Sequence, residues 1–376
     1  MATLTSLLYS LAFYATLLII PTACTCSLGY DLGKPKNHVP FFIFGDSFSD
    51  AGNNNYINTS TIVQANYWPY GETLFQYPGG RFSDGRLSVD FIAEYANIPF
   101  IPPFLHPGVH RFSDGANFAS SGAGVLVETY RGLVINLKTQ LSYFKKVARG
   151  LKQELGDDEA KKLLSRAVYL ISIGSNDYMF PFLANSTIPA SSQTQYVGRV
   201  IANFSSFIQE IYKIGGRKFG FIRIGTLGCL PALRIIKPEN KGSCLEEVLT
   251  LCKLHNKALS KLLIKLEREL AEFKYSNYDF YTFLSQLMKY PSKYGFKEGE
   301  NACCGTGRFG GVPSCGGRRA VKEYQLCDDP NDYVFWDSFH LTDRAYQQMA
   351  EQMWNGTSPM VEGNYNMKSF FESVAP

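Results

Sequence analysis

Residues 41–53 read FFIFGDSFSDAGN, an apolar run that ends abruptly in a polar turn bounded by glycine. The run predicts a buried strand followed by a turn. Ligands collect outside the carboxyl ends of the strands in a parallel α/β sheet, so Ser47 would lie at the mouth of a site and is a candidate nucleophile. Asp46 and Ser47 could equally cap the turn, as Asp and Ser often do, so the rest of the chain must separate the two interpretations.

Segments with strand and helix patterns alternate after this run. Further strands are expected at residues 115–119, 167–173, 218–224 and 278–283, and helices at residues 133–147, 157–166, 196–214, 244–273 and 342–353, with another opening at residues 83–86. Such alternation predicts an α/β fold with a parallel sheet of about five strands that helices cover on both faces. The sequence contains no internal repeat and no linker composition that would separate a second domain.

Composition and charge indicate a globular protein that does not bind nucleic acid. The 376 residues are 45% hydrophobic, and the net charge of +4 is spread without a basic run. Residues 7–20 form an apolar stretch of signal-peptide length that is too short for a membrane span. We expect residues 1–26 to be removed, by cleavage at an uncertain bond between Ala23 and Ser27. Residues 27–376 would then form a single domain with no integral membrane segment.

Cysteines and glycosylation signals agree with secretion. Seven cysteines follow the leader, at positions 229, 244, 252, 303, 304, 315 and 327. In a secreted chain they predict disulfides, and the odd count leaves one thiol over, which we assign to Cys252. The pair Cys303-Cys304 could suggest zinc, but its spacing lacks a CxxC knuckle, so a metal site is disfavoured. Asn-X-Ser/Thr signals, which predict glycan attachment, occur at Asn58, Asn185, Asn203 and Asn355.

A serine nucleophile needs a base and a group that orients the base, and His340 is the histidine that best fits. It has a carboxylate, Asp337, three residues before it in a loop just ahead of a helix, so one turn could present both side chains to a hydroxyl. The other four histidines are His38, His106, His110 and His255. His38 lies in the segment that leads into the first strand, His106 and His110 lie in an irregular loop, and His255 lies in a charged helix. An isolated D-x-x-H pattern more often belongs to a surface loop, so the assignment depends on the other polar clusters in the chain.

Polar clusters follow three expected strands. They supply Ser47, a small-residue turn with Gly122 and Gly124, and Asn176. Backbone N–H groups and a side-chain amide are the donors that an oxyanion hole requires.

Four motifs together resemble the GDSL esterase/lipase family, within the wider SGNH hydrolases, and more specifically its plant branch. They are FGDSFSDAGN at residues 44–53, NFASSGAG at 117–124, GSND at 174–177 and DSFH at 337–340. The resemblance covers residues 39–354 and implies a three-layer α/β/α sandwich with flavodoxin-like topology. It also implies serine chemistry without a metal or an organic cofactor.

The resemblance further implies a role for each candidate. It assigns the nucleophile and one oxyanion N–H to Ser47, a second N–H to Gly122 with Gly124 as the less favoured register, the oxyanion amide to Asn176, and the acid and base to Asp337 and His340. Two departures leave these positions intact: Phe48 where some relatives have Leu, and Leu341 where many plant members have Pro. Asp46 is expected to be structural.

We therefore expect a secreted, monomeric ester hydrolase of the apoplast or cell wall that acts on a small-molecule or lipid ester through an acyl-enzyme on Ser47. An acyltransferase with the same triad is one alternative. A catalytically idle protein that binds lipid or glycan through the aromatic excursion at residues 53–80 is another. That excursion and the Cys-rich segment at residues 299–317, expected to be irregular, either shape the pocket or are packed surface loops.

Overall fold

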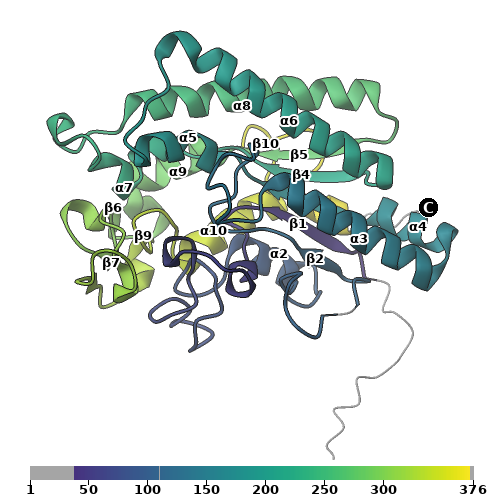
Figure 1. The fold of residues 1–376 in the computed structure, drawn as a ribbon, viewed down its shortest axis with the longest axis horizontal. Coiled ribbons are helices and arrows are strands. Elements are labelled where there is room, and N and C mark those ends of the chain that lie inside the picture. The colour runs from purple at the N-terminus through teal and green to yellow at the C-terminus, as the bar shows by residue number, and fades with distance from the viewer. Residues whose placement is uncertain (1–37, 110, 373–376) are drawn as a thin grey trace, which may run out of the picture. The chain divides into compact units, whose positions relative to one another are not determined.

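The computed structural model describes residues 38–109 and 111–372 (Figure 1). The expected signal peptide, its cleavage site and His110 lie outside the described residues. Among the residues that the structure describes, no helix is both long enough and apolar enough to span a bilayer.

Six strands form the central sheet. They are β1 (Phe41–Gly45), β2 (Gly115–Asn117), β3 (Val168–Ser172), β4 (Lys218–Ile222), β5 (Lys274–Tyr278) and β10 (Val361–Glu362). Their order is β10-β5-β4-β3-β1-β2, with β1 to β5 parallel and β10 antiparallel at the edge. The order 2-1-3-4-5 of the parallel strands is the flavodoxin-like one, and its direction reverses between β1 and β3. The α/β prediction is confirmed, and the sheet gains an antiparallel sixth strand.

The predicted fifth strand at residues 278–283 is wrong. Strand β5 ends at Tyr278, and helix α9 (Phe280–Lys289) begins two residues later. The Asp279 side chain accepts a hydrogen bond from the Thr282 N–H and so caps this helix. The buried positions of α9 fall at helical spacing, which the aromatic composition of the segment conceals.

The remaining α-helices lie on both sides of the sheet. They are α2 (Ser88–Tyr95), α3 (Leu137–Leu155), α4 (Asp157–Arg166), α5 (Ser175–Leu183), α6 (Gln193–Ile214), α7 (Pro231–Arg234), α8 (Glu246–Glu269), α10 (Asp343–Asn355) and α11 (Met367–Glu372). Helices α6 and α8 lie side by side, and α10 lies against α2 and α11 (Figure 1). The predicted helix at residues 157–166 agrees with α4, and the other predicted ends differ by up to four residues, except that α3 continues to Leu155 although its end was predicted at residue 147.

The aromatic side chains of β1 connect the three layers. Successive side chains of a strand point to opposite faces. Phe44 packs against Phe207 of α6, at 5.2 Å between ring centres, whereas Phe41 packs against Phe371 of α11, at 5.4 Å. All four phenylalanine and isoleucine side chains of residues 41–44 are at most 1% exposed. The strand is therefore a buried central layer between helices, which confirms the predicted sandwich.

Three disulfides cross-link the described part of the chain, and the predicted disulfides and the assignment of the unpaired thiol to Cys252 are confirmed. They join Cys229 to Cys244, Cys303 to Cys327 and Cys304 to Cys315. Among the described residues, Cys252 is the free cysteine, and it is buried. The Cys-rich segment is more regular than expected, since it contains the short strands β6 (Glu298–Ala302) and β7 (Cys304–Gly305), which pair with β9 (Tyr333–Phe335) and β8 (Gln325–Leu326).

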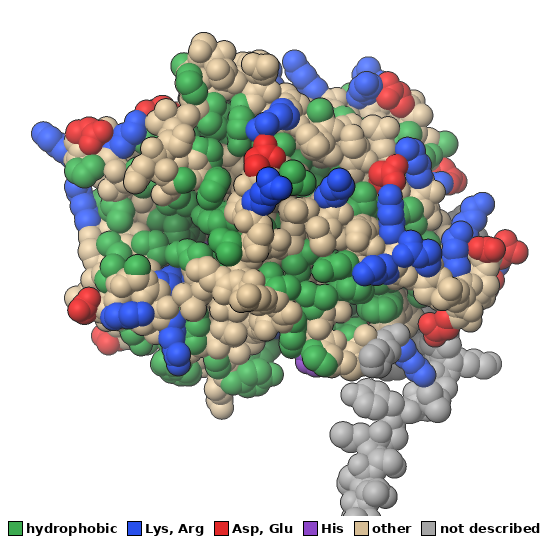
Figure 2. Space-filling model, in the orientation of Figure 1, with side chains coloured by type: hydrophobic (Ala, Val, Ile, Leu, Met, Phe, Trp, Pro, Cys, Tyr) green, Lys and Arg blue, Asp and Glu red, His purple; other side chains and the backbone are tan. Residues whose placement is uncertain are grey.

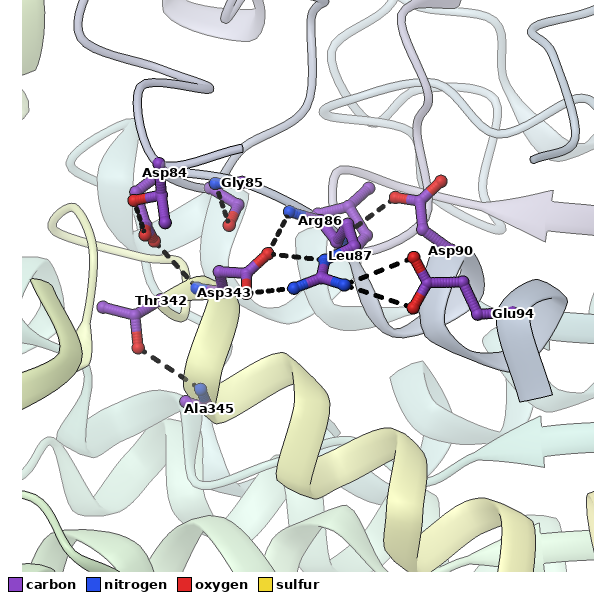
Figure 3. Close-up of polar contacts among 11 residues, drawn as sticks. Asp84, Gly85, Arg86, Leu87, Asp90, Glu94, Thr342, Asp343 and Ala345 are labelled. Atoms are coloured by element: carbon purple, nitrogen blue, oxygen red, sulfur yellow. Dashed lines mark hydrogen bonds and ion pairs between the residues drawn. The ribbon is translucent and has the colours of Figure 1, made fainter. Parts of the chain in front are cut away.

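A polar network fixes the start of α10 (Figure 3). Thr342 caps the helix through the Ala345 N–H. The Asp343 N–H donates to Asp84, and the Asp343 carboxylate accepts hydrogen bonds from Arg86, whose guanidinium also pairs with Glu94. Residues 84 and 86 were expected to open a helix, but α2 begins only at Ser88 because they anchor α10 instead.

We expect Gly85→Ala to disturb this network. A Cβ atom at position 85 would lie 2.4 Å from Asp343 Oδ1, so the carboxylate and the start of α10 would have to move. Such overpacking costs about 1–3 kcal/mol, measurable by urea unfolding. Gly150→Ala is the matched control: that site, exposed in α3, has nothing within 4 Å of the added atom, so the change should stabilise by about 0.5–1 kcal/mol. Equal effects of the two changes would contradict the packing argument.

Candidate active site

Ser47 lies in the turn that directly follows β1. The Asp46 N–H donates to the Ser172 carbonyl of β3, and the carbonyl of Asp46 accepts hydrogen bonds from the N–H groups of Ser49 and Asp50. The turn therefore closes tightly at the carboxyl end of the sheet, next to the point where the strand order reverses. Ser47 is 8% exposed and lines the cavity described below.

His340 and Asp337 lie in one tight turn before α10. The Asp337 Oδ1 atom accepts hydrogen bonds from the backbone N–H groups of Phe339 and His340. His340 Nδ1 is 2.8 Å from Asp337 Oδ1, and His340 Nε2 is 2.7 Å from Ser47 Oγ. The structure thus brings the three predicted side chains into one hydrogen-bonded chain. Leu341, the departure from the family pattern, is fully buried and does not disturb it.

Charges and hydrogen bonds keep Asp337 ionised. Burial alone would raise the pKa of Asp337, but the charges of His340 and Arg319 and the hydrogen bonds from His340 and Phe339 outweigh burial and hold this pKa well below its usual range. An ionised Asp337 beside Nδ1 favours the imidazole tautomer in which Nε2 is free to accept a proton from Ser47.

The candidate oxyanion donors come from two further loops. Asn176 lies in the first turn of α5, and its amide Nδ2 is held 3.0 Å from the Ala123 carbonyl. Gly122 has a positive φ of 80° and lines the same cavity as Ser47 and Asn176. Gly124 does not line it, since a side chain there would meet Thr129 and Asp177.

Two buried carboxylates hold these loops from behind. Asp50 accepts hydrogen bonds from the backbone N–H groups of Gly52, Asn53 and Ser121. Asp177 accepts from the N–H groups at positions 125 and 126 and from the Thr129 hydroxyl. Sequence reasoning missed both roles. The sequence did contain a signal for these roles, because the motifs contain more Asp and Asn residues than catalysis needs.

Asp46 is buried, and its carboxyl group forms no hydrogen bond with Ser47, Asp337 or His340. Its Oδ1 atom accepts a hydrogen bond from the Phe48 N–H, while Oδ2 has no partner among the described residues. Burial raises the pKa of Asp46 from 3.8 to about 7, opposed by the Phe48 N–H and assisted by the nearby charge of Asp177. A neutral carboxyl is cheaper to bury than a carboxylate whose second oxygen lacks a donor.

We expect Asp46→Asn to flatten the pH dependence of stability. Because the pKa of Asp46 is higher in the folded state, the folded chain binds more protons than the unfolded chain between about pH 4 and pH 7. Stability contributed by this residue is therefore present below about pH 4 and lost as the pH rises to about 7, by up to about 4 kcal/mol. Urea unfolding from pH 4 to 8 measures it. Asp50 and Asp177 supply the same background in both proteins, so identical pH slopes for variant and wild type would refute the assignment.

An apolar cavity of about 300 Å³ opens beside Ser47. Hydrophobic side chains gather around a hollow on the face drawn in Figure 2. Besides Ser47, Gly122, Asn176 and His340, the cavity is lined by Asp46, Phe48, Ile62, Val63, Phe82, Ser121, Tyr130, Ser175, Met179, Leu183, Pro313 and Phe339. Its walls come from the aromatic excursion, α5 and the Cys-rich segment, so both irregular segments do shape the pocket.

The remaining predicted residues lie elsewhere. His255 is buried against the Tyr178 hydroxyl, and burial lowers its pKa to about 3; His106 packs against the Tyr56 ring. Neither contacts Ser47. The four candidate glycosylation sites, Asn58, Asn185, Asn203 and Asn355, are all exposed. Within the described part of the chain, no three His, Cys, Asp or Glu side chains form a group that could hold a metal ion.

A hydroxyl, an imidazole and a carboxylate joined in this way beside an apolar cavity are the arrangement of a serine hydrolase. Comparison with known proteins narrows the class. Residues 41–353 match the model of the GDSL-like lipase/acylhydrolase family. The chain belongs to this family of carboxylic ester hydrolases.

Plant relatives match most of the chain. It is 57% identical to "GDSL esterase/lipase 5" and 50% identical to "GDSL esterase/lipase 2", both of Arabidopsis thaliana. The first match covers 90% of this chain and 88% of the relative. The second covers 96% of this chain and 96% of the relative. It is also 47% identical to the "GDSL lipase" of Tanacetum cinerariifolium, over 94% of this chain and 92% of the relative.

Proposed function

We propose that this ester hydrolase acts in two steps through an acyl-enzyme on Ser47. The observation that carries the proposal is the 2.7 Å contact between Ser47 Oγ and His340 Nε2, with Asp337 on the other side of the imidazole. A hydroxyl becomes nucleophilic when an adjacent base can take its proton, and this contact supplies the base.

In the first step His340 takes the proton from Ser47 as Oγ attacks the ester carbonyl carbon. The tetrahedral intermediate collapses when the protonated imidazole gives that proton to the leaving alcohol oxygen and the carbon–oxygen bond breaks. In the second step His340 takes a proton from water, which attacks the acyl carbon. The protonated imidazole then returns the proton to Ser47 Oγ, and the acid leaves.

Three donors would hold the negative oxygen that forms in both steps: the N–H groups of Ser47 and Gly122 and the amide of Asn176. The hydrogen bond from the amide to the Ala123 carbonyl supports this role, because a donor that is oriented before the reaction loses little free energy to reorganisation. Asp337 orients the imidazole and stabilises its protonated form.

The cavity favours an ester with an apolar acyl or alcohol group. Apart from Asp46, Tyr130 and His340, no ionisable side chain among the described residues lines it, and its remaining walls are largely aliphatic and aromatic. Burial of an apolar group there contributes roughly 25 cal/mol per Å². A small-molecule or lipid ester is therefore the substrate class, with water as the acceptor that we propose. Acyl transfer to a second alcohol would share the same acyl-enzyme.

We further propose secretion to the apoplast or cell wall as a monomer, after loss of residues 1–26, with residues 27–376 as one domain. Three disulfides support an oxidising compartment. The exposure of Asn58, Asn185, Asn203 and Asn355 supports glycan attachment in the secretory route. The assembled Ser47, His340 and Asp337 chain favours an active hydrolase over an idle binding protein.

Ser47→Ala should abolish hydrolysis across a panel of p-nitrophenyl esters and covalent labelling by an organophosphonate, because no other hydroxyl of the described residues contacts His340 Nε2. Ser49→Ala is the matched control. The Ser49 hydroxyl is buried two residues away without a hydrogen-bond partner among the described residues, so activity should remain. Labelling that persists in the Ser47 variant would disprove the assignment of the nucleophile.

Asn176→Ala should lower kcat by roughly 10²–10³-fold with a smaller effect on KM, since an oxyanion donor acts mainly on the transition state. Steady-state kinetics on one short-chain ester measures both constants. Asn364→Ala, at an exposed position outside the cavity, serves as the control for substitution of an Asn. A change confined to KM would assign Asn176 to substrate binding instead.

A further inference from the structure

The aromatic excursion and the Cys-rich segment meet behind Asp337. A second, smaller apolar cluster, which we name the aromatic–cystine cluster, joins them. It consists of Ala65, Tyr67, Tyr70, Phe82, Cys303, Cys304, Cys315 and Trp336. Trp336 is the residue directly before Asp337, so this cluster backs the turn that carries the acid of the candidate triad.

Tyr70 reaches the carboxylate directly. Its hydroxyl donates a hydrogen bond of 2.7 Å to Asp337 Oδ2, and its side chain is fully buried. Burial raises the pKa of Tyr70 well above its usual range, so the hydroxyl keeps its proton and acts as a donor. The other partner of Oδ2 is His340 Nδ1, at 3.0 Å. Without Tyr70 the carboxylate would lose its shortest hydrogen bond.

Arg319 supplies a buried positive charge to the same place. It is 5% exposed, and its guanidinium carbon lies 5.7 Å from the centre of the Tyr70 ring. Its Nε and Nη2 atoms lie 3.5 and 3.4 Å from the carbonyl oxygens of Thr61 and Gln64, which are long contacts. The positive charge of Arg319 lowers the pKa of Asp337 and so favours its ionised form, although less than the neighbouring His340 does.

Disulfide chemistry holds this arrangement together. Cys315 is bonded to Cys304, and the turn after Cys315 packs onto the excursion. A side chain at Gly316 would meet the Trp68 carbonyl at 2.5 Å and the Tyr67 ring at 2.7 Å, so the two segments are in close contact. Arg319 follows three residues later.

We propose that Tyr70 and Arg319 are positioning residues, which hold the Asp337 carboxylate ionised and in one orientation and so keep the His340 imidazole oriented to accept the Ser47 proton. The inference rests on the proposed function of Ser47, Asp337 and His340. Several charged or titratable groups face Asp337 from the elements around it. They are His340 from its own turn, Tyr67 and Tyr70 from the excursion, Arg319 from the loop after the Cys-rich segment and Tyr346 from α10.

The direction of the effect follows from charge. Removal of a donor or of a positive charge makes the carboxylate more basic and strengthens its attraction to protonated His340. The pair then keeps its proton to a higher pH, and the acid limb of the kcat/KM profile moves to higher pH. Loosened orientation of the imidazole lowers kcat as well.

The test compares pH profiles of kcat/KM. Tyr70→Phe should lower kcat about tenfold at little change in KM and move the acid limb up by roughly one pH unit. Tyr67→Phe is the matched control, since its hydroxyl lies in the same cluster without a hydrogen-bond partner among the described residues.

Arg319→Gln should move the acid limb of the kcat/KM profile in the same direction, and Arg319→Lys, which keeps the charge, should restore it. A purely structural role would lower activity at every pH without moving the limb, and that result would overturn the proposal.

A second measurement needs no turnover. In the inactive Ser47→Ala background, the low-field proton resonance of the hydrogen bond between His340 and Asp337 should shift on Tyr70→Phe and stay unchanged on Tyr67→Phe. An unchanged resonance in both variants overturns the positioning role whatever the nucleophile is. Activity that survives Ser47→Ala overturns the proposed function instead, so the two failures are distinguishable.

Discussion

The hydrogen bond between the Ser47 hydroxyl and the His340 imidazole is the interaction on which the arrangement depends, because its partners lie 293 residues apart in the chain. Each end must be fixed independently. At one end β1 is buried between two helical layers, and the turn after it is tied to β3. At the other end Thr342 caps α10, and Asp343 anchors that helix to Asp84 and Arg86. A displacement of about 1 Å at either end would break the contact.

Burial of carboxylates is the electrostatic cost of holding the loops between these ends. Burial raises the pKa of Asp50 and Asp177 to about 6 each, although several N–H groups lower it, and that of Asp46 to about 7. These acids organise loops that must be compact and free of bulky side chains near the substrate. Asp337 differs because charged partners accompany it. Burial therefore favours the neutral form of Asp46, Asp50 and Asp177, whereas the charged partners of Asp337 keep that residue ionised.

The sequence was most informative where function and local structure coincide. Ser47 follows a predicted strand, Asp337 and His340 precede a predicted helix, and the resemblance to the GDSL family implied that the three act together. The prediction of a fifth strand at residues 278–283 was wrong because aromatic residues occur both in strands and in buried helices. The Asp279 side chain caps α9 and so favours a helix there. The pairing of β10 and the contacts of Tyr70 and Arg319 join segments distant in the chain. Such contacts leave no periodic pattern, so the sequence alone could not predict them.

The two irregular segments also stabilise each other by packing together. The excursion at residues 53–80 contains no strand or α-helix, and the strands of the Cys-rich segment are short. Two tyrosines, Trp336 and two disulfides pack against one another where these segments meet. Cross-links limit the conformations open to such loops, and the packed cluster then offers a rigid surface behind Asp337. The precision of the site thus depends in part on the two disulfides that cross-link these segments.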